Sequence, residues 1–333
     1  MKNNYSLNFI KAIVPIFLFS FFIIAEAQTN SVLFIKISPE IPGAYEEVTA
    51  SVSSPSVNLD IASISWSLDG KKFSSNVGQK SITFKTKGVG EKTTVVATAT
   101  LGNTFLSDTA TINPSEVDIL WEATDIYTPP FYKGKALPTS ESSIKVTIVP
   151  SVFKSNGVAY KTSELSYKWS RNGEILGSLS GRGASTLSLK NDYLKREESI
   201  GVETRNTSDV KIGKGGVIIR IVDPKILFYE KNPILGVLYN KSLFNSINLS
   251  NEELSLVAEP YFISPRDKTS SKIQYTWSLN GSPVATNSKN PNILVVRQQT
   301  GVGGEANVSL EVTSPSKILL SATNNLMLNF KGR

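Results

Sequence analysis

The chain has 333 residues, with 35 Lys and Arg against 28 Asp and Glu, a net charge of +7, and neither cysteine nor histidine. It can therefore form no disulfide, no thiolate nucleophile, no Ser-His-Asp triad and no thiolate or imidazole metal site. Its length suits two or three domains, which must be stabilised by burial of hydrophobic side chains alone.

The N-terminus has the features of an export signal. A positively charged start leads into an apolar run over residues 12–25, and Ala25 and Ala27 place small residues at the −3 and −1 positions. This pattern predicts a signal peptide over residues 1–27 with cleavage before Gln28. A retained membrane anchor is the alternative, but a spanning helix needs about 20 apolar residues. We therefore expect a secreted, extracellular or cell-surface protein, periplasmic in a cell with two membranes.

One motif then occurs three times, as residues 64–70 (ISWSLDG), 167–173 (YKWSRNG) and 275–281 (YTWSLNG). Its tryptophans, Trp66, Trp169 and Trp277, are 103 and 108 residues apart, which is the length of a small domain. Alternation of apolar and polar residues places each tryptophan on the buried face of a strand, as a marker of the core. The Asp-Gly or Asn-Gly that follows predicts a turn, because these residues accept positive φ.

Short period-2 strands surround each motif. They are predicted at 48–52, 81–84, 94–100 and 109–112, at 144–148, 186–189, 200–204 and 217–222, and at 254–258, 292–295, 308–312 and 325–330. About seven short strands per ~100 residues indicate a β-sandwich. The sequence thus predicts an all-β protein of three tandem immunoglobulin-like β-sandwich domains over residues 28–116, 117–223 and 224–333.

The second and third predicted domains share an insertion that the first lacks. Trp121 and Phe228 occupy equivalent positions, and Tyr132 and Tyr239 follow eleven residues later. In the second domain the insertion is rich in proline and aromatic residues. The candidate patch for a partner or a domain junction comprises Trp121, Tyr127, Pro129, Pro130, Phe131, Tyr132, Phe228 and Tyr239.

Two interpretations of this patch stay open. The aromatic side chains either pack at a junction between domains, or form an exposed surface that binds a glycan or a protein. We expect the first, with Trp121 buried near the junction of domains one and two and Phe228 buried near that of domains two and three. The protein would then be a semi-rigid rod.

No arrangement of residues indicates catalysis. The acidic pairs at 197–198 and 252–253 are adjacent in sequence, and neighbouring residues of a strand point to opposite faces. No calcium-binding loop is present, and the glycine-rich stretches at 88–90 and 301–304 fit hairpin turns and not phosphate loops. We therefore expect a protein that is not an enzyme, with no catalytic residue, no cofactor and no metal site.

The strand-borne Trp followed by Ser-x-Asp/Asn-Gly resembles strand C of immunoglobulin-like domains. Residues 35–43 (IKISPEIPG) resemble the first strand of bacterial Ig-like and PKD-like surface modules. The resemblance covers residues 31–330, but the chain lacks the cysteine pair of antibody domains and the Gly-Asp-Gly turn of PKD repeats. It implies a secreted bacterial protein with several Ig-like or PKD-like β-sandwich repeats.

The predicted function is that of a cell-surface or extracellular structural or adhesive protein. A rod of Ig-like domains would mediate contacts with proteins or with the envelope, and a surface filament or pilus system is one setting for it. The alternative is a carbohydrate-binding module protein that uses exposed aromatic side chains of the second domain's insertion. We expect a protein or glycan of the cell envelope as partner, with membrane contact only before cleavage. We expect no nucleic acid, because the chain has no run of basic residues.

Overall fold

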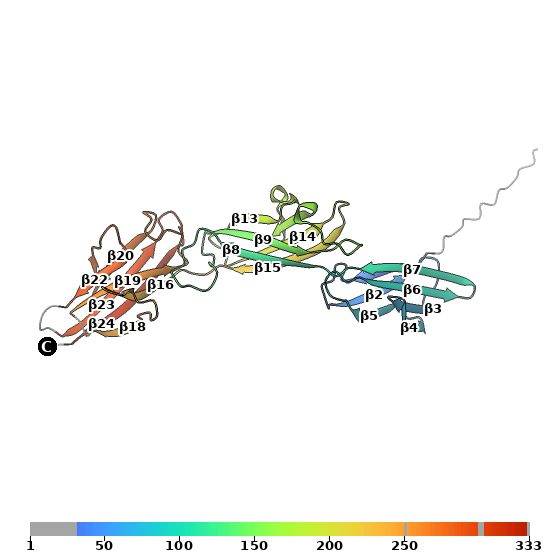
Figure 1. The fold of residues 1–333 in the computed structure, drawn as a ribbon, viewed down its shortest axis with the longest axis horizontal. Coiled ribbons are helices and arrows are strands. Elements are labelled where there is room, and N and C mark those ends of the chain that lie inside the picture. Colours follow the sequence, from blue (N-terminus) through green and yellow to red (C-terminus); the bar gives the residue numbers. More distant parts are fainter. Residues whose placement is uncertain (1–31, 250–251, 299–302, 332–333) are drawn as a thin grey trace, which may run out of the picture.

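A computed structural model describes residues 32–249, 252–298 and 303–331. The predicted signal peptide lies outside these residues. β-Strands form six sheets, and the helical elements of the described residues are the 3₁₀ turns η1 (Thr162–Glu164) and η2 (Gly177–Leu179). The sheets are grouped into units that lie end to end in an elongated array (Figure 1). The prediction of an all-β fold is confirmed.

No helix in the described part of the chain has the length and apolar character needed to cross a membrane.

The unit around Trp66, comprising residues 32–112, packs a sheet of order β1-β2-β5 against a sheet of order β4-β3-β6-β7. Side chains of β2 alternate between the core and the solvent, and Val48, Ala50 and Val52 contribute to a core centred on Trp66. The strands are β1 (Phe34–Ser38), β2 (Glu47–Ser53), β3 (Ser63–Leu68), β4 (Lys71–Val77), β5 (Ser81–Lys85), β6 (Thr93–Leu101) and β7 (Thr104–Ile112).

The Trp169 unit, residues 116–222, repeats this arrangement with sheets of order β13-β9-β8 and β11-β10-β14-β15, and β12 also pairs with β10. Its core includes Ile144, Val146 and Ile148 of β9. The strands are β8 (Glu116–Ala123), β9 (Ser143–Ser151), β10 (Ser166–Arg171), β11 (Glu174–Ile175), β12 (Gly181–Arg182), β13 (Thr186–Lys190), β14 (Glu197–Arg205) and β15 (Lys211–Arg220).

The Trp277 unit, residues 225–331, has sheets of order β17-β16-β19-β22 and β18-β24-β23-β20-β21. Strand β18 comes from the insertion and pairs in parallel with β24, from Asn245 opposite Leu326 to Leu249 opposite Phe330. The strands are β16 (Lys225–Asn232), β17 (Gly236–Val237), β18 (Asn245–Leu249), β19 (Glu253–Tyr261), β20 (Gln274–Leu279), β21 (Ser282–Val284), β22 (Ile293–Arg297), β23 (Gly304–Thr313) and β24 (Ser321–Phe330). The domain limits expected from the sequence stay predictions.

The tryptophan of the repeated motif has the same environment in all three units. Trp66 and Trp169 are 0% exposed and Trp277 is 1% exposed. Each indole N–H nevertheless has a hydrogen-bond acceptor, a backbone carbonyl two residues before the start of β5, β13 or β22. The acceptors are Gln79 at 2.9 Å, Ala184 at 2.8 Å and Pro291 at 2.8 Å, in chain order. A tryptophan therefore fills the core without leaving its polar atom unsatisfied.

The residue three positions after each tryptophan joins two strands. Asp69, Asn172 and Asn280 have φ of 51°, 52° and 51°, in the left-handed region that Asp and Asn tolerate better than other non-glycine residues. Each side-chain oxygen accepts a backbone N–H from the neighbouring strand, from Thr94 at 2.9 Å, Ser199 at 2.9 Å and Asn307 at 2.8 Å. The motif is thus repeated because one position must combine positive φ with a hydrogen-bond acceptor.

Candidate functional site at the second junction

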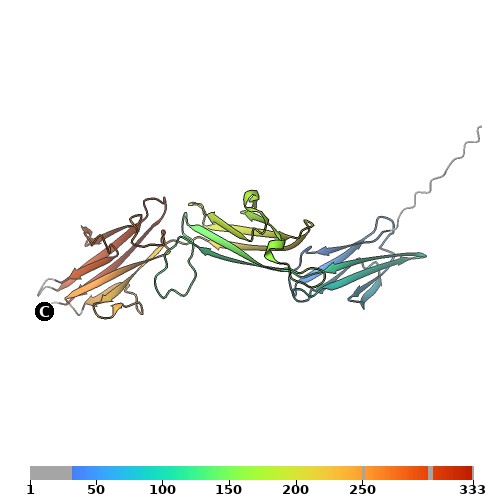
Figure 2. The same ribbon diagram turned by 45° about the horizontal axis from the view of Figure 1, so that its top comes forward.

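The insertion of the Trp169 unit, residues 124–142, packs on the Trp277 unit, and we call this contact the second junction. The Tyr127 N–H donates to the Ile263 carbonyl at 2.8 Å, and the Phe262 N–H donates to the Tyr127 carbonyl at 3.1 Å. The two backbones are thus paired as neighbouring strands are. Figure 2 shows the insertion as a loop that extends from the end of β8 beside the orange strands of the Trp277 unit.

Aromatic side chains cover one side of this backbone pair. The Tyr132 ring meets the rings of Tyr261 and Phe262 at centroid distances of 5.9 and 5.6 Å, edge to face. Ile126 is buried in the same small cluster. Phe131 is 83% exposed, although its ring lies 5.7 Å from that of Tyr239. The second junction therefore has a small hydrophobic core of its own.

A buried carboxylate lies next to these rings. Glu259 of β19 is 0% exposed, and it accepts hydrogen bonds from the Tyr127 hydroxyl at 2.6 Å and the Tyr239 hydroxyl at 2.9 Å. The Lys268 ammonium donates to both carboxylate oxygens, at 2.6 and 2.8 Å. Both oxygens are thus satisfied, and one of the donors, Tyr127, belongs to the other unit. Loss of this contact would leave a buried charge short of a partner, which is costly.

The tyrosines at this site stay protonated at neutral pH. Burial, and then the hydrogen bond to the Glu259 carboxylate, raise the pKa of Tyr127 above its ordinary value. Burial and the nearby charge of Glu259 likewise raise the pKa of Tyr239. Both hydroxyls therefore act as hydrogen-bond donors, which suits binding between two surfaces.

A second polar group, centred on Asp125, also joins the two units. One Asp125 carboxylate oxygen accepts the Ser143 N–H within its own unit at 2.8 Å. The other accepts the Ser264 hydroxyl at 2.8 Å and the Lys317 ammonium at 3.1 Å, both from the Trp277 unit. Lys317 also donates to the Glu141 carbonyl at 3.0 Å.

Glu141 completes this polar group with its side chain. Its carboxylate accepts the Ile318 N–H at 2.8 Å from the Trp277 unit and the Lys190 ammonium at 3.3 Å from its own. The hydrogen bond from Ile318 and the charge of Lys190 lower the pKa of Glu141 below its ordinary value. The two ends of the insertion are thus both anchored to the neighbouring unit.

The structure brings together four of the eight residues of the candidate patch. Tyr127, Phe131, Tyr132 and Tyr239 meet at the second junction, and both insertions contribute to it. The prolines lie at the turn before Phe131, Pro129 buried and Pro130 exposed, and the Tyr132 N–H donates to the Pro129 carbonyl at 3.3 Å.

The expected positions of the other two aromatic residues were wrong. Trp121 lies on the flank of the Trp169 unit, partly buried, with the Lys135 ammonium 3.2 Å from its ring centroid. It is not at the first junction, because β8 carries it along the unit and away from residues 32–112. Phe228 is fully buried inside the Trp277 unit, 5.7 Å from the Trp277 ring. It belongs to that core and not to a junction.

Sequence reasoning missed the charged residues of the second junction. Asp125, Glu141, Glu259, Lys268 and Lys317 are scattered over the chain, and each is a residue type that is usually exposed. Alternation along β19 places Glu259 on the face opposite Leu256 and Ala258, and from the sequence alone that face would be predicted to face solvent. In the structure a neighbouring unit packs on that face, and no local sequence pattern indicates this contact.

No protein-family model and no curated protein matches this sequence. Solved structures with a similar arrangement include the three N-terminal domains of the bacteriophage RB49 Highly Immunogenic Outer Capsid protein (10% identity, 91% of this chain and 99% of that one, TM-score 0.26). They also include the central fibronectin-III array of RIM-binding protein (12%, 91% and 97%, 0.33) and immunoglobulin domains 1–4 of Sidekick-1 (11%, 91% and 75%, 0.21). These neighbours are tandem domain arrays, and the fold assignment itself rests on the sheets and cores described above.

Proposed function

We propose that the protein is a non-enzymatic structural or adhesive protein of the cell surface or extracellular space. A rod of Ig-like domains presents its faces to proteins or polymers of the envelope. The observation that supports this proposal most is the second junction, where two insertions fix one unit on the next. A spacer needs such a joint, because two domains held in one orientation bind a common partner without the entropy cost of ordering them.

The other candidate, a carbohydrate-binding module that uses the aromatic side chains of the insertion, has less support. Phe131 is exposed, but Tyr132 packs edge to face against Tyr261 and Phe262 of the next unit. The Phe131 ring is itself tilted by 59° against that of Tyr239. These rings offer no flat pair on which a sugar could stack.

The proposal is tested by crosslinking in the native cell followed by mass spectrometry. We expect one envelope protein or polymer to be crosslinked to both the Trp169 unit and the Trp277 unit. A Lys317→Met variant, which weakens the second junction, should lose the double contact, and Lys214→Met, on an exposed position of β15, should keep it. Recovery of no envelope component, or the same crosslinks in both variants, would contradict the proposal.

A further inference from the structure

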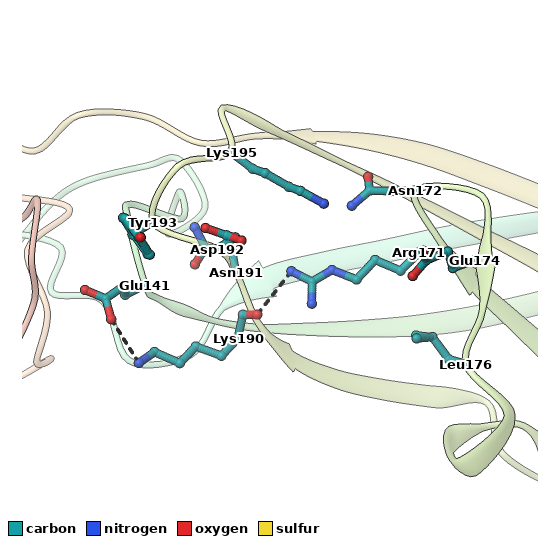
Figure 3. Close-up of a pocket in the computed structure, with 10 residues that line it drawn as sticks. All are labelled: Glu141, Arg171, Asn172, Glu174, Leu176, Lys190, Asn191, Asp192, Tyr193 and Lys195. Atoms are coloured by element: carbon teal, nitrogen blue, oxygen red, sulfur yellow. Dashed lines mark hydrogen bonds and ion pairs between the residues drawn. The ribbon is translucent and has the colours of Figure 1, made fainter.

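A polar cavity of about 520 Å³ opens on the Trp169 unit, beside the second junction. It lies between the end of β10 and the loop after β13, as Figure 3 shows. Its lining carries both signs of charge, with Glu141, Glu174 and Asp192 facing Arg171, Lys190 and Lys195. Its volume falls in the range of small-molecule sites, roughly 300–1,000 Å³.

The cavity is built where the Trp169 unit departs from the repeat. Arg171 takes the position that Leu68 and Leu279 hold in the other units, one residue before the Asp or Asn of the motif. Arg171 is paired with Ile200 of the neighbouring strand β14, and Glu198 lies two residues before Ile200. The equivalent residues of the other units are Thr93 and Ala306. An exchange of uncharged for charged residues at one spot of a repeated fold needs a reason, because replacing a buried ion pair by packed apolar side chains is often neutral or stabilising.

Glu198 and Arg171 form a fixed floor. Glu198 is fully buried and pairs with both Nε and Nη2 of Arg171, while the Asn172 amide donates to it at 2.8 Å. Burial raises the pKa of Glu198, but the hydrogen bonds from Arg171 and Asn172 outweigh burial, so that its pKa is lowered overall. Nη2 of Arg171 also donates to the Lys190 carbonyl at 3.2 Å, as the dashed line in Figure 3 shows.

The rim is also held in place. Asn191, which is buried, accepts the Ser142 hydroxyl at 3.2 Å and donates to the Thr139 carbonyl at 2.9 Å. The loop of residues 191–195 is thereby tied to the insertion. Groups placed this way lose little entropy when a ligand binds.

Several side chains that line the cavity have no partner in the described part of the protein and are available to bind a ligand. Within the described residues, the side chains of Glu174, Tyr193 and Lys195 make no hydrogen bond or ion pair, and Tyr193 is 41% exposed. Glu198 neutralises Arg171, and Glu141 neutralises Lys190. The remaining charges are two carboxylates, of Glu174 and Asp192, against the Lys195 ammonium. These three charges sum to −1, so the cavity disfavours an anionic ligand, and a single excess charge at an open site attracts a cation only weakly.

We propose that this cavity is a binding site for a neutral saccharide. A sugar hydroxyl both donates and accepts hydrogen bonds, which matches a lining of carboxylates, an amide, an ammonium and a phenol. The apolar face of a sugar ring would lie against the exposed Tyr193 ring. This site is distinct from the aromatic residues of the insertion, and it does not depend on the proposed role of the rod.

The test is isothermal titration calorimetry on the full exported chain with cellobiose, lactose, maltotriose and N,N′-diacetylchitobiose. Galacturonate and glucosamine serve as anionic and cationic comparisons. We expect at least one neutral sugar to bind. Lys195→Met should reduce the affinity about tenfold or more, as for loss of one hydrogen bond to a charged group. Tyr193→Ala should reduce it by about tenfold, because it removes the ring against which the sugar lies.

The matched controls are Tyr45→Ala and Lys214→Met, exposed positions outside the cavity, which should leave the affinity unchanged. Thermal unfolding curves serve as the control for folding: a variant whose unfolding midpoint equals that of the wild type is folded. The proposal is overturned if no neutral sugar binds, if only the charged sugars bind, or if the cavity variants bind as the wild type does.

Discussion

The two junctions of this chain differ in what crosses them. At the second junction the backbones of Tyr127 and Phe262 are paired, and Glu259 and Lys317 each bind groups of the other unit. At the first junction the Phe153 ring lies against Gly90, where an added Cβ would come within 3.2 Å of it. No hydrogen bond or ion pair joins residues 32–112 to residues 116–223, all of which the structure describes.

The length of one connection accounts for this difference. In the Trp169 unit, 19 residues (124–142) separate β8 from β9, and they extend over the next unit. In the Trp66 unit, β1 and β2 are separated by residues 39–46, which are too few to do so. We therefore expect this rod to be stiff at the second junction and more compliant at the first, with the length of the insertion setting the difference.

The largest effect should come from the core tryptophans. Trp66→Ala should destabilise the Trp66 unit by about 3–5 kcal/mol, as for large core aromatics. Because little crosses the first junction, protection from hydrogen exchange in the Trp169 unit should not change. Trp277→Ala should destabilise its own unit equally and also reduce protection in the insertion at 124–142. Hydrogen-exchange mass spectrometry distinguishes these two outcomes. If both variants reduced protection in the neighbouring unit to the same extent, the proposed difference between the junctions would be wrong.

Glu259→Ala tests the buried carboxylate of the second junction. It leaves the Lys268 ammonium and two tyrosine hydroxyls without their acceptor, and we expect a loss of about 3–5 kcal/mol from the Trp277 unit, as for breaking a buried ion pair. Glu305→Ala, at an exposed position of β23, is the control and should cost little. Urea unfolding curves that coincide for the two variants would show that Glu259 does not hold the junction.

Lys317→Met removes the ammonium that Asp125, Glu141 and Ser264 share, while keeping the apolar stem. The expected loss is about 1–3 kcal/mol, as for hydrogen bonds to a charged group. Most of it should appear as a weaker junction, because these partners lie mainly across it. Small-angle scattering should then give a broader distribution of shapes. An unchanged scattering curve would assign Lys317 a role within its own unit only.

The smallest effect concerns pH. The pKa of Glu141 is lowered in the folded protein, so its contribution is complete above the ordinary glutamate value of about 4.3 and is lost as pH falls through the folded value. Acidification should therefore loosen the second junction but not the first, across which the described residues form no ion pair. A Glu141→Gln variant should lose this pH dependence. A wild-type junction that is unchanged in acid would contradict the assignment.

The parts of this structure that repeat were accessible from the sequence, and the parts that join the repeats were not. The tryptophan and the Asp or Asn three residues later obey local rules, burial by alternation and positive φ, so one chain shows them three times. Trp121 and Phe228 look equivalent in sequence, yet one lies on a flank and the other in a core. What separates them is how each sheet packs, which a linear pattern does not encode. The cavity above Glu198 is visible only as a departure from the repeat, Arg171 in place of leucine.

The difference between the junctions is tested most directly by distances between spin labels. Because the chain has no cysteine, pairs of cysteines can be introduced for labelling, at Lys214 with Glu305 and at Lys72 with Lys214, all exposed positions. Double electron–electron resonance should give a narrow distance distribution between positions 214 and 305, and a clearly broader one between 72 and 214. Distributions of equal width, or a broader one across the second junction, would contradict the account.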